Sequence, residues 1–469
     1  MMRVGSMFEA VRTHSDQDTP DRAAKGLADW SALPPAARAE AAAVCAAWAA
    51  TVQARLGAFS VLQAVDNADN GKPDDAAPLA GLPYAAKDMF DTPGRAPGCG
   101  LPNALRPPPA GTAAVLERMD GAGARRIGFA TMTALAYEPS GVGTARNPWN
   151  RDVVTGGSSS GSAVAVAAGA VFVALGSDTA GSLRIPAQAC GVTAWKPTHG
   201  AVPAAGAMPL APSLDSVGLL ARSARDIQLA APVLRGTATA PSPSPALAPS
   251  RLAVLSDALA EADAPVRAAC AEGVEAITAC GASIDKQAGL AAIEALSAPL
   301  FLVLQAEAAA VNRGLDLAAA DPTLARRLSK GDAIAAEELA AARKALADAL
   351  APFLDGVFGA ADALLLPVMP IRTPLVAEAD PASPAFRAAT LYRLSAYTRF
   401  VNALGLPAVA VPVGVDDRGL PVALQIVGRP GTDAGLLELA AAMQARTGWH
   451  RRRPTELPDF PSLLLERGL

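Results

Sequence analysis

Residues 156–186 read GGSSSGSAVAVAAGAVFVALGSDTAGSLRIP, and the remainder of the chain is best interpreted from this stretch outward. It opens with a glycine–serine loop, continues with small apolar residues from Ala163 to Leu175, and closes with a second glycine–serine loop. Glycine and serine fill a hydrophobic core poorly. They suit a functional site, because glycine lets a ligand approach the backbone closely and serine supplies a nucleophilic hydroxyl group. The stretch therefore predicts two loops of a functional site that are joined by one buried element.

The composition is that of a large globular protein. Hydrophobic residues make up 51% of the 469 positions and aromatic residues only 4%, so the core must be built from small side chains. The formal net charge of −4 predicts no nucleic-acid partner. Five scattered cysteines, an odd number without a CxxC pair, favour a reducing compartment over a disulfide framework or a metal site.

Nothing in the sequence indicates secretion or a membrane. The first residues, MMRVGSMFEAVRTHSD, lack the apolar segment of a secretory signal. Glycine, proline or charged residues interrupt the longest apolar runs at short intervals. We therefore expect a cytoplasmic protein with no membrane-spanning segment.

Apolar periodicity and turn signals alternate in a pattern that predicts an α/β fold. The expected helices are Ala23–Leu33, Ala36–Leu56, Ala113–Ala122, Pro299–Gly314, Ala335–Leu354 and Leu436–Thr447. The expected strands are Leu82–Phe90, Arg126–Ala130, Leu252–Leu255, Ala363–Pro370 and two between Phe400 and Gly428, around a turn at Asp416–Gly419. Thr237–Ser250, which is rich in proline, serine and alanine, predicts a linker.

The mostly helical block 258–360 lies inside an α/β pattern that resumes after it. We therefore expect one domain, 1–469, with an insertion, and not separate domains. Its expected parts are a helical N-terminal layer (1–75), a core (76–235), a helical insertion (236–362) and a C-terminal return to the sheet (363–469).

The serine loops allow three interpretations. Each loop can simply be a helix N-terminus capped by serine. Alternatively, GSSSG at 157–161 satisfies the pattern G-x-S-x-G, which would make Ser159 the nucleophile of an α/β-hydrolase. The base would then be His199 or His450. The segment before this motif is turn-like, however, where an elbow requires a strand. In the third interpretation a neutral lysine activates a serine, and Lys87 fits because burial of the preceding run LPYAA would lower its pKa from about 10.4.

Several motifs, in order along the chain, resemble the amidase signature family of amide hydrolases. They are PYAAKD (83–88), RNPW (146–149), GGSS (156–159), GSDTAGSLRIP (176–186), CG (190–191), KPT (196–198), PLAPSLD (209–215), NALGLPA (402–408), PVG (412–414) and GLP (419–421). The resemblance covers 76–235 and 363–430 closely, and the other parts by position only. It implies a single amidase-signature domain with a large, mixed, twisted β-sheet covered by helices on both faces.

The resemblance also implies a Ser–cisSer–Lys triad. Carried over residue by residue, Ser182 is the nucleophile, Ser158 is the bridging serine after a cis Gly157–Ser158 peptide bond, and Lys87 is the base. Neutral Lys87 would take a proton from Ser158, which would take one from Ser182 as that residue attacks the amide carbonyl. The G-x-S-x-G pattern around Ser159 is then a coincidence.

Further roles follow from the same resemblance. The backbone N–H groups of Thr179, Ala180, Gly181 and Ser182 would form the oxyanion hole, and Met132 and Ser158 would contact the substrate. The family usually has glycine where Ala180 stands, and the extra methyl group is expected to trim the acyl pocket. Arg184 could meet a substrate carboxylate, but we favour a structural role because arginine so often pairs structurally.

The implied reaction is hydrolysis of an amide C–N bond without a cofactor or metal. Three functions remain open. The first is an amidase whose substrate is a small alkyl or aryl amide, or a urea derivative of the biuret or allophanate type. The second is the glutaminase (A-type) subunit of a tRNA-dependent amidotransferase, and the third is a non-catalytic binding protein. The intact triad residues argue against the last, and the missing acidic–Phe segment at Ala134–Ala136 disfavours the second. The expected partners are a small-molecule amide and, as an open option, a second copy of the chain in a homodimer. Specificity is expected to lie in 258–360 and Pro374–Tyr397.

Overall fold

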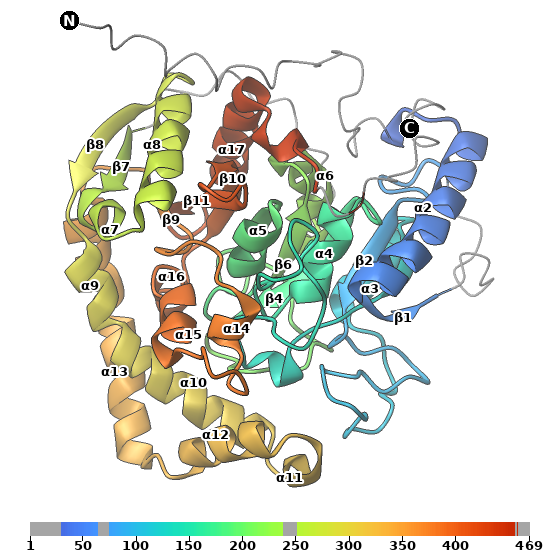
Figure 1. The fold of residues 1–469 in the computed structure, drawn as a ribbon, viewed down its shortest axis with the longest axis horizontal. Coiled ribbons are helices and arrows are strands. Elements are labelled where there is room, and N and C mark those ends of the chain that lie inside the picture. Colours follow the sequence, from blue (N-terminus) through green and yellow to red (C-terminus); the bar gives the residue numbers. More distant parts are fainter. Residues whose placement is uncertain (1–29, 64–74, 238–250, 455–456, 458–469) are drawn as a thin grey trace, which may run out of the picture.

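One mixed sheet of eleven strands runs through the molecule (Figure 1). The structure, a computed structural model, describes residues 30–63, 75–237, 251–454 and 457. The strands lie in the order β1-β3-β2-β4-β6-β5-β10-β11-β9-β7-β8. Their bounds are β1 Phe59–Leu62, β2 Pro83–Lys87, β3 Arg125–Ala130, β4 Val173–Asp178, β5 Thr193–Lys196, β6 Ser216–Ala221, β7 Arg251–Leu255, β8 Ser283–Gln287, β9 Ala363–Pro367, β10 Ala408–Val415 and β11 Pro421–Gly428.

The sheet is parallel at two places and antiparallel elsewhere. β2 is parallel to both β3 and β4, and β7 is parallel to both β8 and β9. The pairs β1–β3, β4–β6, β5–β6, β5–β10, β10–β11 and β9–β11 are antiparallel. The expected α/β fold with a mixed sheet is therefore confirmed.

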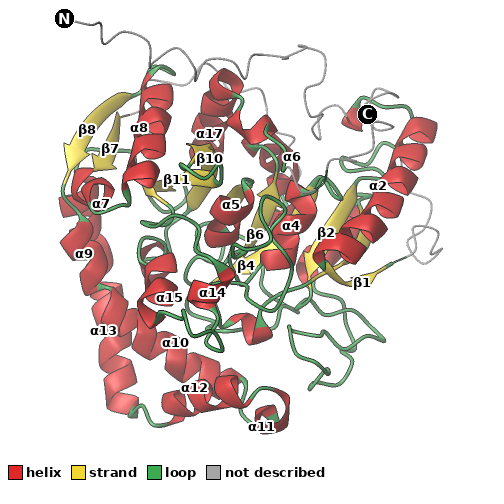
Figure 2. Cartoon of the chain, in the orientation of Figure 1, coloured by secondary structure: helices red, strands yellow, loops and turns green. Residues whose placement is uncertain are grey.

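Helices surround the sheet (Figure 2). They are α2 Pro35–Leu56, α3 Ala114–Gly121, α4 Ser160–Ala167, α5 Arg184–Cys190, α6 Ala224–Arg235, α7 Ser256–Ala260, α8 Ala264–Thr278, α9 Leu290–Ala295, α10 Ser297–Val311, α11 Leu317–Ala320, α12 Pro322–Asp332, α13 Ala336–Phe353, α14 Val376–Ala379, α15 Ala388–Leu394, α16 Arg399–Ala403 and α17 Asp433–Thr447, with short turns of helix at Ala134–Ala136, Leu354–Phe358 and Trp449–Arg451.

Both faces of the sheet are covered, as the alternation of side chains along the strands shows. In β2, Tyr84 and Ala86 belong to the hydrophobic cluster that includes residues of α3, α6, α8 and α17. Ala85, which lies between them, belongs to the cluster that includes residues of α2, α4 and α5. Because successive side chains of a strand point to opposite faces, these two clusters lie on opposite sides of the sheet. Many members of both clusters are alanine or valine, as the low aromatic content predicts.

Most of the expected elements are confirmed within a few residues, including α2, α3, α10, α13 and α17 and the strands β2, β3, β7, β9, β10 and β11.

Three expectations are corrected. The N-terminal layer contains a strand, β1, and the insertion supplies β7 and β8, of which β8 falls in a block expected to be helical. The apolar run Ala163–Leu175 is not one element, because it is divided between α4 and β4. The predicted linker, after Thr237, and most of the predicted helix Ala23–Leu33 lie outside the described residues.

Strands from all four predicted parts of the chain join in the one sheet. Within the described residues, one segment, Leu290–Val311, is long and apolar enough to cross a membrane. Its helix α10 packs in the structure against α12, α13 and α16.

The helix α4 approaches the neighbouring backbone closely at Gly161. A Cβ atom at this position would lie 2.5 Å from Thr131 N and 2.7 Å from Thr131 O, and closer still to Ala58 O. All three atoms belong to the backbone and cannot move aside as a flexible side chain can. Gly161 thus allows α4 to pack against the residues that follow β3.

Replacing Gly161→Ala should lower the free energy of unfolding by about 2 kcal/mol, because the added methyl group overpacks this contact. The matched control is Gly435→Ala in α17, where an added Cβ would meet no atom within 4 Å. This control should leave the free energy unchanged or raise it slightly. Chemical denaturation of both variants measures the difference, and equal values would contradict the assigned contact.

Candidate active site

The candidate site lies where β2 and β4 end. β2 is parallel to β4, with Ala86 opposite Leu175 in the register. Because parallel strands end at the same edge of a sheet, the last residues of both strands lie together. These residues are Lys87 at the end of β2, and Ser177 and Asp178 at the end of β4.

Lys87 is held between two serine hydroxyl groups. Its Nζ atom lies 2.6 Å from Ser158 Oγ and 2.7 Å from Ser177 Oγ, and the residue is 0% exposed. Burial lowers the pKa of Lys87 to about 7, although the carboxylates of Asp215 and Asp178 act in the opposite direction. A large fraction of Lys87 is therefore neutral near pH 7, and a neutral amine can accept the hydroxyl proton of Ser158.

The first serine loop presents only one of its hydroxyl groups to Lys87. The peptide bond Gly157–Ser158 is cis, as the family resemblance implied. Ser159 faces β4 instead: its Oγ donates to Ser177 O (3.1 Å) and accepts from Ser177 N (3.3 Å). Ser160 Oγ lies 2.9 Å from Thr144 Oγ1. Ser158 is thus the member of this loop that can exchange a proton with Lys87.

The nucleophile elbow around Ser159 does not form. No strand is described directly before the loop, where an elbow requires one. The buried Ser159 hydroxyl group is occupied by backbone atoms of β4. His199, one of the two alternative bases, is exposed to solvent.

The second loop carries Ser182 next to a buried carboxylate. Ser182 is 9% exposed, whereas Lys87 and Ser158 are 0% exposed, so Ser182 is the member of the predicted triad that approaches solvent. The carboxylate of Asp178 accepts hydrogen bonds from Gly181 N (2.8 Å) and Leu183 N (3.1 Å), which shape the turn around Ser182.

The hydrogen bonds of this turn distinguish the four N–H groups that are predicted to form the oxyanion hole. The N–H group of Gly181 already donates to Asp178, so it is not free to bind an oxyanion. Among the described residues, the N–H groups of Thr179, Ala180 and Ser182 make no hydrogen bond. These three of the four predicted donors are therefore available.

Arg184 completes the anchoring of the loop. It forms an ion pair with Asp178 (2.9 Å) in which both side chains are 0% exposed. Arg184 also donates to Asn402 Oδ1 (2.7 Å) and Gln425 Oε1 (3.1 Å). Burial alone would raise the pKa of Asp178, but Arg184 and the hydrogen bonds outweigh this effect and lower the pKa to about 2. The structural role favoured for Arg184 is confirmed.

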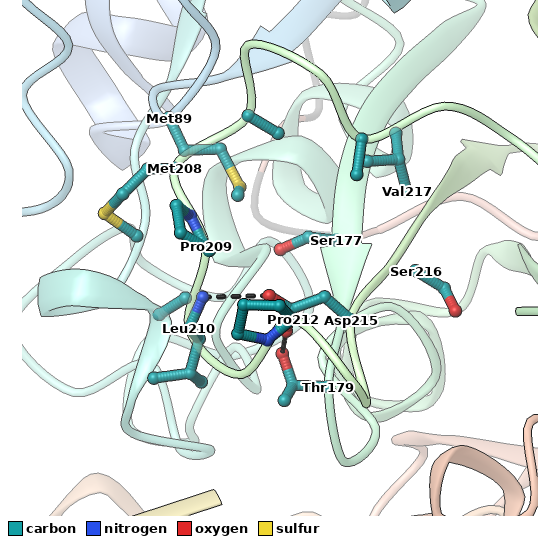
Figure 3. Close-up of a pocket in the computed structure, with 13 residues that line it drawn as sticks. Met89, Ser177, Thr179, Met208, Pro209, Leu210, Pro212, Asp215, Ser216 and Val217 are labelled. Atoms are coloured by element: carbon teal, nitrogen blue, oxygen red, sulfur yellow. Dashed lines mark hydrogen bonds between the residues drawn. The ribbon is translucent and has the colours of Figure 1, made fainter. Parts of the chain in front are cut away.

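Ser177, whose hydroxyl group contacts Lys87, also lines a cavity of about 250 Å³ (Figure 3). Its polar lining includes Ser177, Thr179, Asp215 and Ser216. The lining residues are Met89, Ala136, Ser177, Thr179, Ala204, Ala207, Met208, Pro209, Leu210, Pro212, Asp215, Ser216 and Val217. The predicted substrate contact Met132 is not among them: it is 1% exposed and belongs to the hydrophobic core.

Sequence reasoning assigned no role to three residues that the structure places at the site. Ser177 contacts Lys87, Asp215 accepts a hydrogen bond from Thr179 Oγ1 (2.6 Å), and Thr398 Oγ1 donates to Ala180 O (2.6 Å). Ser177 and Asp215 lie inside the quoted motifs GSDTAGSLRIP and PLAPSLD, so a signal was present without a role. Thr398 lies outside every quoted motif and carries no sequence signal.

Replacing Arg184→Met should lower the free energy of unfolding by about 3–5 kcal/mol, because it leaves the Asp178 carboxylate buried without its cation. The control Arg372→Met removes an exposed ion pair with Asp417 (2.9 Å) and should cost under about 1 kcal/mol. Chemical denaturation at pH 7 compares the two variants, and equal losses would refute the anchoring role.

The same ion pair has a defined pH dependence. The pKa of Asp178 is lower in the folded protein than in the unfolded chain, so its stabilising contribution is present above about pH 4 and is lost as the pH falls towards 2.

The chain is similar to several known proteins. The family model described as Amidase matches residues 42–437. The chain is 33% identical to the A-type subunit of the glutamyl-tRNA(Gln) amidotransferase of Symbiobacterium thermophilum, over 86% of this chain and 92% of that protein. A crystal structure of an amidase superposes with a TM-score of 0.77 at 30% identity, covering 90% of this chain and all of that one. The structure of a 6-aminohexanoate cyclic dimer hydrolase superposes with a TM-score of 0.78 at 25% identity, covering 90% of this chain and 95% of that one. The chain belongs to the amidase signature family of amide hydrolases.

Proposed function

We propose that the chain hydrolyses the C–N bond of a small-molecule amide through an acyl-enzyme on Ser182. The observation that carries this proposal is the contact of 2.6 Å between Lys87 Nζ and Ser158 Oγ. The burial that lowers the pKa of Lys87 to about 7 supports its role as a base at neutral pH. The neighbouring hydroxyl group of Ser177 fixes the amine from a second direction.

Acylation begins with two proton transfers. Neutral Lys87 accepts the proton of Ser158, and Ser158 accepts the proton of Ser182 as Ser182 Oγ attacks the amide carbonyl carbon. The free N–H groups of Thr179, Ala180 and Ser182 stabilise the negative charge on the carbonyl oxygen. When the C–N bond breaks, Ser158 returns a proton to the leaving amine and regains one from Lys87. Water then hydrolyses the ester on Ser182, which restores the free enzyme.

A second candidate function is that of a glutaminase in a tRNA-dependent amidotransferase. The observation that favours it is the set of curated relatives at 30–35% identity, which are named as A-type subunits of glutamyl-tRNA(Gln) amidotransferases. In this function the amide substrate is glutamine, and the chain works together with another protein of the complex.

Replacing Ser182→Ala should abolish covalent labelling by a fluorophosphonate probe and amide turnover, because it removes the nucleophile. Replacing Ser159→Ala is the matched control, since Ser159 lies in the first serine loop and, among the described residues, its hydroxyl group bonds to the backbone of Ser177 alone. This control should keep most of the labelling. Mass spectrometry of the labelled peptide identifies the modified serine. Loss of labelling in Ser159→Ala together with its retention in Ser182→Ala would overturn the proposal.

A substrate panel separates the two candidate functions. A stand-alone amidase should release amine or ammonia from at least one alkyl amide, aryl amide, biuret or allophanate without any other protein. A glutaminase of an amidotransferase should release ammonia from glutamine, and only or far faster when its partner protein is present. Coupled ammonia detection with the purified chain measures both. Rapid hydrolysis of a simple amide together with inertness towards glutamine would exclude the second candidate.

A further inference from the structure

Three acidic groups act electrostatically on the buried Lys87. They are the carboxyl groups of Asp215 and Asp178 and the thiol of Cys99. Each would stabilise an ammonium group on Lys87 if it carried a net negative charge that no other cation neutralises. The structure distinguishes them by their own partners.

Two of these groups offer no net negative charge to Lys87. The carboxylate of Asp178 is paired with Arg184 at 2.9 Å, and neither side chain is exposed. The thiol of Cys99 is 3% exposed as a residue, and burial raises its pKa to about 12, so it is neutral at physiological pH. Asp215 is the remaining group.

Asp215 is a carboxylate without a cation. It accepts hydrogen bonds from Thr179 Oγ1 (2.6 Å), Leu210 N (2.9 Å) and Ala211 N (3.1 Å), all of them uncharged donors. Among the described residues, no lysine, arginine or histidine forms an ion pair with it. Burial raises the pKa of Asp215 to about 6, so it is mostly ionised above pH 7.

Asp215 and Ser177 line the same cavity (Figure 3). Ser177 Oγ lies 2.7 Å from Lys87 Nζ, so one residue, Ser177, both contacts the amine and lines the cavity that Asp215 lines. Apolar side chains such as Met89, Met208 and Val217 make up much of the wall. A charge beside such apolar side chains acts more strongly than it would in bulk water, because the effective dielectric constant is lower there.

We infer that Asp215 is a positioning residue whose negative charge stabilises the ammonium group that forms on Lys87 when Lys87 takes the proton of Ser158. Asp215 neither gives nor receives a proton in this step: the proton moves from Ser158 Oγ to Lys87 Nζ and later returns. The inference rests on the proposed function, in which Lys87 is the base. It assigns to the PLAPSLD segment a role in setting the strength of that base.

The test is the rate at which a fluorophosphonate probe labels Ser182 in the full chain, measured between pH 5 and 9. In the unmodified protein this rate should rise through about pH 7, as Lys87 loses its proton. Replacing Asp215→Asn keeps the size of the side chain but removes its charge. The rising limb of the pH–rate profile, which is the pH range where the labelling rate increases, should then move to lower pH by about one unit. The reason is that the ammonium form of Lys87 is less stable without the charge. The plateau rate should fall by about three- to tenfold, because Lys87 is a weaker base.

Two further variants separate charge from shape. Asp215→Glu keeps the charge, so its rising limb should stay at the pH of the unmodified protein. Glu307→Gln is the matched control, because Glu307 holds the same segment through Ser213 N (3.0 Å) and Ser213 Oγ (2.8 Å) but is not among the charges that act on Lys87. Its rising limb should also stay in place.

The outcomes are distinct. The inference would be overturned if the rising limb of the pH–rate profile did not move in Asp215→Asn, or if it moved by the same amount in Glu307→Gln. Either result would leave Lys87 as the base. If Asp215→Asn does not fold, Asp215→Glu decides, because a limb at lower pH in that variant contradicts a role for the charge. Failure of the probe to label Ser182 in the unmodified protein would instead refute the proposed function.

Discussion

The complete burial of an amine at the end of a central strand is the constraint on which the site depends. Lys87 ends β2, which lies between β3 and β4 in the sheet. An ammonium group in such a position is costly, and the cost is avoided when the amine is neutral. Two serine hydroxyl groups, at 2.6 and 2.7 Å, satisfy the amine without adding charge. The same burial that would be a defect in a purely structural core therefore leaves an amine that can accept a proton near neutral pH, as the proposed function requires.

The polar groups around Lys87 are divided between an anchored pair and an unpaired charge. Asp178 and Arg184 neutralise one another, and their bonds to Gly181, Leu183, Asn402 and Gln425 tie the Ser182 turn to β11 and α16. A buried pair of this kind contributes little net stability compared with apolar packing, but it fixes geometry because either charge alone would be expensive. Asp215 forms no ion pair among the described residues, and we propose that its charge acts on Lys87.

The small side chains of this core serve the same arrangement. Gly161 lets α4 approach the backbone at Thr131, and the alanines of α4 pack closely on the sheet. The two serine loops at the ends of the α4–β4 unit are thereby brought together: Ser159 N donates to Ser182 O at 3.2 Å, and Ser159 Oγ contacts the backbone of Ser177. Ser159, the candidate elbow nucleophile, thus joins the two loops, and the neighbouring Ser158 contacts Lys87.

The sequence by itself determined the α/β class and most helices and strands of the described chain, because the spacing of apolar residues and the positions of turn residues are local properties. It also indicated the family, through the order of its motifs. It also pointed to Lys87, Ser158 and Ser182, which lie in those motifs. Tertiary structure alone decided that β1, β7 and β8 join the sheet, since strand pairing depends on distant partners and not on local pattern. It alone showed that Gly181 N–H donates to Asp178, that Ser177 contacts Lys87 and shares a cavity with Asp215, and that Thr398 bonds to Ala180 from 218 residues away. Such contacts join residues far apart in the chain, and no spacing within the sequence encodes them.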